Sequence, residues 1–197
     1  MALESRDVVS MVATISTLAL FLTGICILWL KYGILRQDGT LIVVNTVGVI
    51  LQSIYILIFY LNSYEKDSLH RKMLYSSLLV FPVLAYIKFY VDELDTALFQ
   101  LGLICSCCSV VMYGSPLSTV AEVIRTKSTA SMAFMLCLAN FLVSLEWAFY
   151  GYIVMDSFIK VPNIIGALLG SIQLTLFYCY SGSPGVGHQA GGSVSTV

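Results

Sequence analysis

An internal repeat places the strongest constraint on the fold of this chain. Residues 29–60 recur at 147–178, without a gap, at an offset of 118 positions. Two apolar segments often share aliphatic letters, but a shared register of Trp, Asp and Asn rarely arises by chance. The identical pairs include Trp29/Trp147, Tyr32/Tyr150, Gly33/Gly151, Asp38/Asp156, Asn45/Asn163, Gly48/Gly166 and Tyr60/Tyr178. The chain therefore contains two copies of one structural unit.

The composition indicates that this unit lies in a bilayer. The 197 residues are 58% hydrophobic and 11% charged, whereas about a quarter of a soluble domain is charged. A net charge of −1 gives no reason to expect nucleic acid as a partner. Only helices or closed barrels satisfy their backbone in lipid, and runs near 20 apolar residues indicate helices. The apolar runs are 8–34, 40–61, 73–91, 98–122, 132–155 and 158–180.

No chemistry of a catalytic or metal site is visible. All six cysteines lie in apolar runs, and the cluster Cys105–Cys108 has no His or carboxylate near it in sequence, so it is interpreted as helix packing. No phosphate-binding loop or HExxH motif occurs, and no second CxxC is present to pair with Cys105–Cys108. We therefore expect neither an enzyme nor a cofactor. The acidic N-terminus is unlike the start of a cleaved signal peptide, which favours a membrane span for the first run.

The charges of the links predict their sides of the membrane. Links 62–72 and 123–131 are basic and are expected in the cytosol, because basic loops stay inside. Links 35–39, 92–97 and 154–158 then face outward. The Gly/Ser-rich tail 181–197 is expected to be cytosolic and disordered. Its last residues, Ser195–Val197, fit a ligand of a PDZ-type domain.

The first repeat is shorter than the second. Phe21–Gly24 aligns with Tyr113–Pro116 at an offset of 92, whereas the offset is 118 from Ile27 onward, a difference of 26 residues. The first copy lacks the counterpart of 119–144, so two helices are expected to be fused into the run 8–34. The predicted organisation is a truncated first repeat (1–61, with helices 8–34 and 40–61), a basic loop and linker helix (62–97), a complete second repeat (98–180) and the tail (181–197).

Several motifs in order resemble the SWEET sugar transporters in their animal form. They are WxxYG, a Trp-to-Asn spacing of sixteen, Pro-Asn before GxxxG, and the stretch SPL…VIRTKST, and the likeness covers residues 27–180. SWEETs are a known example of parallel repeats. The resemblance implies an all-α membrane bundle of two three-helix repeats joined by a linker helix, here with about six spans. It also implies a bidirectional uniporter for mono- or disaccharides in the plasma membrane, the Golgi membrane or both.

The resemblance assigns roles to individual residues. The family pocket is formed by a Trp and an Asn from each repeat, which match Trp29, Asn45, Trp147 and Asn163. Pro116 matches a gating proline. The chain departs from the family because the first cytosolic loop and the start of the second helix are absent, and Ala133 stands where a proline is usual. Six spans with an inside C-terminus also put the N-terminus inside, opposite to the family.

The spacing of these residues gives the site a physical basis. Trp29 and Asn45 each lie eight residues from residue 37, and Trp147 and Asn163 each lie eight from residue 155. Residues equidistant from the turn of a helical hairpin share one level, here about 12 Å from the turn. An indole covers the C–H face of a sugar ring, and an amide donates and accepts hydrogen bonds. The alternative is that the Asn residues bond between helices and the Trp residues form an interfacial belt.

The remaining candidates concern bending, packing and partners. Pro116 and Pro162 are hinge or gate candidates; Gly48, Gly166 and Gly170 are candidates for close helix packing, within the bundle or between protomers. Glu146 lies beside Trp147 and is a candidate for proton coupling, but its repeat counterpart is Leu28, so a carboxylate that faces a wet vestibule is favoured. Besides a sugar carrier, the chain could be a non-transporting form that associates with a full-length relative. An amino-acid exporter of the PQ-loop type is less favoured, because no Pro-Gln pair occurs.

Overall fold

The computed structural model describes residues 5–63 and 66–180, with side chains from Leu20 onward. Within these ranges the chain forms seven α-helices and no strand. The helices are α1 (Ser5–Arg36), α2 (Gly39–Asn62), α3 (Lys66–Tyr90), α4 (Leu94–Val111), α5 (Gly114–Thr126), α6 (Phe134–Ile153) and α7 (Ser157–Tyr180).

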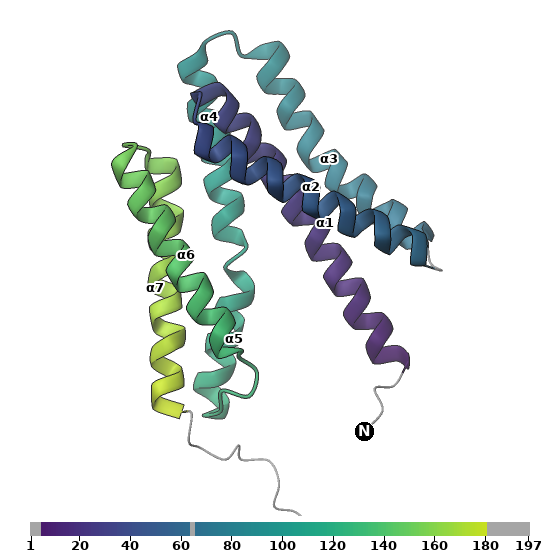
Figure 1. The fold of residues 1–197 in the computed structure, drawn as a ribbon, viewed down its shortest axis with the longest axis vertical. Helices are drawn as coiled ribbons and strands as arrows, with labels where there is room; N and C mark the ends of the chain where they lie inside the picture. The colour runs from purple at the N-terminus through teal and green to yellow at the C-terminus, as the bar shows by residue number, and fades with distance from the viewer. Residues whose placement is uncertain (1–4, 64–65, 181–197) are drawn as a thin grey trace, which may run out of the picture. The chain divides into compact units, whose positions relative to one another are not determined.

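The helices form two compact units that divide between Cys105 and Ser106, inside α4. In the first unit α1 packs against both α2 and α3. Helices α2 and α3 meet at one end and diverge from it (Figure 1). In the second unit α7 packs against α6 and α5. Each unit is described by itself below.

The helices have the length and composition of membrane spans. Five stretches of the described chain qualify: α2, α3, α4 together with α5, α6, and α7. Only 6% of the apolar window of α2 is buried. Such an apolar surface suits lipid, which solvates it without cost, whereas the helix satisfies its own backbone. The expected fused run forms one helix: α1 has 32 residues, which corresponds to about 48 Å. The all-helical, multi-pass prediction is confirmed.

Several element boundaries differ from the sequence prediction, among them that of α4, which begins at Leu94 inside the predicted link 92–97. The run 98–122 was expected as one helix but breaks at 112–113 into α4 and α5. Pro116 lacks the N–H that would bond the Met112 carbonyl four residues earlier, so the helix cannot continue through this turn unchanged. The basic link is also shorter than 62–72, because α3 already begins at Lys66.

The turn between α1 and α2 follows from local sequence. Gln37 adopts a left-handed conformation with φ 58°. The next residue, Asp38, donates its N–H to the Gly33 carbonyl (2.9 Å), which closes the end of α1. The Asp38 carboxylate then accepts from the Leu41 N–H (3.0 Å) and caps α2. One residue thus closes α1 with its backbone N–H and caps α2 with its carboxylate, which fixes a tight reversal.

The turn between α6 and α7 has the same construction 118 residues later. Met155 is left-handed with φ 53°. Asp156 donates its N–H to the Gly151 carbonyl (2.9 Å), and its carboxylate accepts from the Phe158 N–H (2.8 Å). The repeat in sequence is thus a repeat in backbone conformation and in hydrogen bonding.

Candidate functional site

Close packing sets the register of the first hairpin. A Cβ added at Gly33 would lie 2.8 Å from the Leu41 Cβ, and one at Gly48 would lie 3.0 Å from the Cys26 sulfur. Both pairs are equidistant from the turn at residue 37. The Thr23 hydroxyl also donates to the Gln52 side-chain oxygen (2.8 Å), and these two residues are nearly equidistant from the turn as well. Helices α1 and α2 therefore remain in one register from the turn back to residue 23.

This register determines the level of the first Trp/Asn pair. Trp29 in α1 and Asn45 in α2 lie between the Gly33 and Gly48 contacts, and each is eight residues from the turn. The two residues accordingly flank the helix seam at one level. Both side chains are half-buried.

The second hairpin keeps the same register. A Cβ at Gly151 would lie 2.7 Å from the Lys160 backbone nitrogen. One at Gly166 would lie 2.7 Å from the Ser144 hydroxyl, and Ser144 is the repeat counterpart of Cys26. A Cβ at Gly170 would lie 2.9 Å from the Phe141 Cβ. These contacts bracket the level of the second pair.

The second pair consists of Trp147 in α6 and Asn163 in α7, both half-buried like their counterparts. Each unit thus holds one of the two predicted Trp/Asn pairs at matching positions of its hairpin.

A tyrosine orients each indole. Trp29 and Tyr32 are T-shaped, with ring centroids 5.6 Å apart and planes at 90°. Trp147 and Tyr150 are 5.5 Å apart at 82°. Edge-to-face contacts of this kind hold one ring against the other. These tyrosines were not among the predicted site residues, although their spacing of three residues from Trp, about one helical turn, was a usable signal.

Each asparagine bonds along its own helix. The Asn45 side-chain nitrogen donates to the Leu41 carbonyl (2.9 Å), and the Asn163 nitrogen donates to the Ile159 carbonyl (2.7 Å). These bonds fix the orientation of both side-chain amides. Each bond uses one of the two N–H groups of its amide, so the second N–H and the oxygen remain for a ligand. They are bonds within a helix, unlike the interhelical bonds of the alternative interpretation.

The second unit also holds its proline segment in place. Pro162, fully buried in α7, cannot donate to the Phe158 carbonyl. The Ser106 hydroxyl donates to that carbonyl instead (2.7 Å). The Tyr113 hydroxyl donates to the Pro162 carbonyl (3.1 Å). Helices α4 and α7 and the segment before α5 are therefore tied together beside Asn163.

The other polar and proline candidates take exposed or terminal positions of their helices. Glu146, next to Trp147 in sequence, is exposed on α6, and so is Asn140, a further polar residue of that helix. Pro116 lies in the first turn of α5, after the break. The described part of the chain holds no group of three His, Cys, Asp or Glu side chains that could bind a metal ion. The tail and its motif Ser195–Val197 lie outside the described residues.

Each unit therefore contains a helical hairpin with a Trp/Asn pair, in a chain whose helices have the length and composition of membrane spans. The sequence profile described as "Sugar efflux transporter for intercellular exchange" matches residues 9–67 and 99–185. The chain therefore belongs to the SWEET family.

Similar proteins agree with this assignment. "Sugar transporter SWEET1" of Rattus norvegicus is 46% identical over 77% of this chain and 69% of the relative. The protein of that name from Homo sapiens is 40% identical over the same shares. A solved structure of a eukaryotic SWEET transporter has a TM-score of 0.75 and 30% identity, and it covers 84% of this chain and 79% of the solved chain.

Proposed function

We propose that this chain is a facilitative carrier that moves a mono- or disaccharide in both directions by alternating access. Trp29, Asn45, Trp147 and Asn163 contact the sugar. The observation that carries the proposal is the duplicated geometry: two indoles fixed edge-to-face by tyrosines, and two amides fixed by bonds of 2.9 and 2.7 Å to their own helices.

The chemistry of these groups suits an uncharged polyol. An indole face packs on the C–H face of a sugar ring, and the free amide oxygen and N–H of each asparagine bond its hydroxyls. A fixed side chain loses little conformational freedom when the ligand binds. The proposed gate is the Pro162 segment of α7. There the Ser106 hydroxyl replaces the missing backbone donor, so that the Phe158 carbonyl keeps a hydrogen bond.

Flux of labelled glucose into liposomes tests this proposal. The wild-type chain is expected to equilibrate the sugar across the membrane, and Asn163→Ala is expected to abolish this flux. Asn140→Ala is the matched control, since Asn140 is an exposed asparagine of the same unit. Equal flux in the two variants would exclude the assignment of Asn163.

One observation favours a second candidate, a non-transporting form that associates with a full-length relative. Leu169 and Leu176 of α7 are 7% and 9% exposed, because they pack in a cluster with Val120 and Val123 of α5. Their first-repeat counterparts, Leu51 and Ile58, are 61% and 56% exposed. The face of α2 that lacks its covering helix could pack on another chain. Absence of flux together with co-purification of the full-length form would support this candidate.

A further inference from the structure

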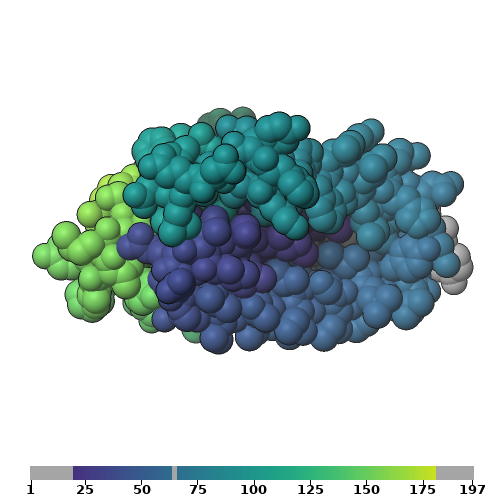
Figure 2. Space-filling view, turned by 90° about the horizontal axis from the view of Figure 1, so that it is seen from above, coloured from purple at the N-terminus to yellow at the C-terminus, as the bar shows by residue number. Residues whose placement is uncertain are grey.

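A cavity of about 570 Å³ lies within the first unit, between α1, α2 and α3. In Figure 2 residues of α1, in dark purple, are visible at the bottom of a groove between α2 and α3. It is separate from the Trp/Asn pairs, because neither Trp29 nor Asn45 lines it. Its size lies within the range of roughly 300–1,000 Å³ that is typical of small-molecule sites.

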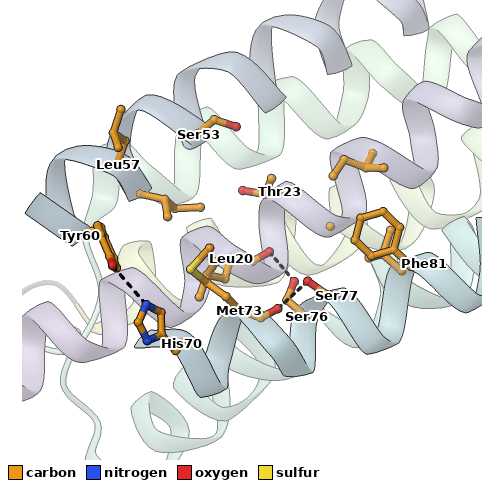
Figure 3. A pocket seen from close by; sticks show the side chains of 14 residues that line it. Leu20, Thr23, Ser53, Leu57, Tyr60, His70, Met73, Ser76, Ser77 and Phe81 are labelled. Atoms are coloured by element: carbon orange, nitrogen blue, oxygen red, sulfur yellow. Dashed lines mark hydrogen bonds between the residues drawn. The ribbon is translucent and has the colours of Figure 1, made fainter. Parts of the chain in front are cut away.

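The walls of this cavity present mainly carbon. Figure 3 shows Leu20, Leu57, Met73 and Phe81 around it. The hydroxyls that line it are largely occupied: Thr23 donates to Gln52 (2.8 Å), Ser76 to the Leu20 carbonyl (3.2 Å) and Ser77 to the Met73 carbonyl (2.7 Å). A polyol would find few free partners on these walls. A hydrocarbon chain fits them, because it needs none.

One end of the cavity is polar and cationic. Tyr60 of α2 and His70 of α3 share a hydrogen bond of 3.3 Å across this end, where the two helices meet (Figure 3). The Lys66 ammonium lies 5.2 Å from the centre of the Tyr60 ring. Lys66 precedes His70 by four residues, so the two share one face of α3, and His70 lines the cavity. The neighbouring Asp67 is about 100° around the helix from Lys66.

The length of the cavity matches one lipid leaflet. From His70 to Phe81 the lining of α3 covers eleven residues, which is about 16 Å of helix. Half of a hydrocarbon core of about 30 Å is roughly 15 Å. A lipid tail that begins at the polar end of the cavity therefore reaches the middle of the bilayer.

We infer that this cavity binds one anionic phospholipid. The tail lies between α1, α2 and α3, and the phosphate lies at the Tyr60–His70 end beside Lys66. Basic pockets between membrane helices are suited to anionic headgroups, and each such cation contributes about 1 kcal/mol, which is about a fivefold change in affinity. This site does not depend on the proposed sugar transport.

Native mass spectrometry of the full chain in neutral detergent tests the inference. Dioleoyl phosphatidylglycerol is titrated against dioleoyl phosphatidylcholine, which has the same tails and no net charge. We expect retention of one phosphatidylglycerol per chain with at least about fivefold preference. Lys66→Gln should reduce that preference about fivefold, whereas Lys88→Gln, at the opposite end of α3, should leave it unchanged.

A second pair of variants tests the tail. Ser53 lines the cavity, so Ser53→Phe should fill it and reduce retention of both lipids. The control is Ser171→Phe at the repeat counterpart, which does not line it. Equal retention of the two lipids by the wild type would overturn the inference, as would equal effects of the two phenylalanine variants. Displacement by glycerol 3-phosphate, or a lipid-free dimer in place of the lipid complex, would also overturn it.

Discussion

The close crossing of α6 and α7 makes Gly151→Ala a sharp test of the packing. The new Cβ would lie 2.7 Å from the Lys160 nitrogen and 2.9 Å from its Cα. Both are backbone atoms that cannot rotate away, so the helices must separate by several tenths of an ångström. Overpacking of this kind typically costs about 1–3 kcal/mol, and for a chain of this size each kcal/mol lowers Tm by about 2–4 °C.

Thermal unfolding of the detergent-solubilised protein, followed by size-exclusion chromatography after heating, measures this effect. We expect Gly151→Ala to lower Tm by about 4–8 °C, which corresponds to about 2 kcal/mol. Gly114→Ala is the matched control, because a Cβ there meets nothing within 4 Å. Equal Tm values for the two variants would refute the crossing described for α6 and α7.

The remaining predictions concern hydrogen bonds and backbone conformation, and the same thermal assay checks them. Ser106→Ala removes the hydroxyl that donates to the Phe158 carbonyl and is expected to lower the free energy of unfolding by about 1 kcal/mol. Ser118→Ala, which removes an exposed hydrogen bond within a single helix, should have no effect. Asp156→Ala removes the cap of α7 and should cost about 1 kcal/mol, whereas Asp92→Ala, outside any helix, should not. Gln37→Gly relieves a left-handed φ of 58° and should raise Tm by about 1–4 °C; an unchanged or lower Tm would contradict this conformation.

The sequence predicted features that depend on local or repeated residues. The offset of 118 positions anticipated both hairpin turns, and it placed Trp29 level with Asn45 by counting from the turn. The fused helix α1 followed from the missing 26 residues. These inferences need only helix geometry, so no knowledge of distant contacts was required.

Features that depend on contacts between distant residues were not predictable. Ser106 and Phe158 are 52 residues apart, and nothing in either segment indicates that the serine replaces the donor lost at Pro162. The cavity of the first unit likewise requires α1, α2 and α3 to be placed together. The break at 112–113 is an intermediate case, because Pro116 signalled a bend but not its position.

The two repeats differ mechanically at one position. Where α7 has Pro162, α2 has Val44, whose N–H allows an uninterrupted backbone ladder. The third helix of the C-terminal repeat therefore lacks one bond of this ladder, and the Ser106 hydroxyl donates to the Phe158 carbonyl in its place. Of the two duplicated hairpins, the C-terminal one alone would then carry a proline in its third helix, and Val44→Pro would give the other the same soft joint.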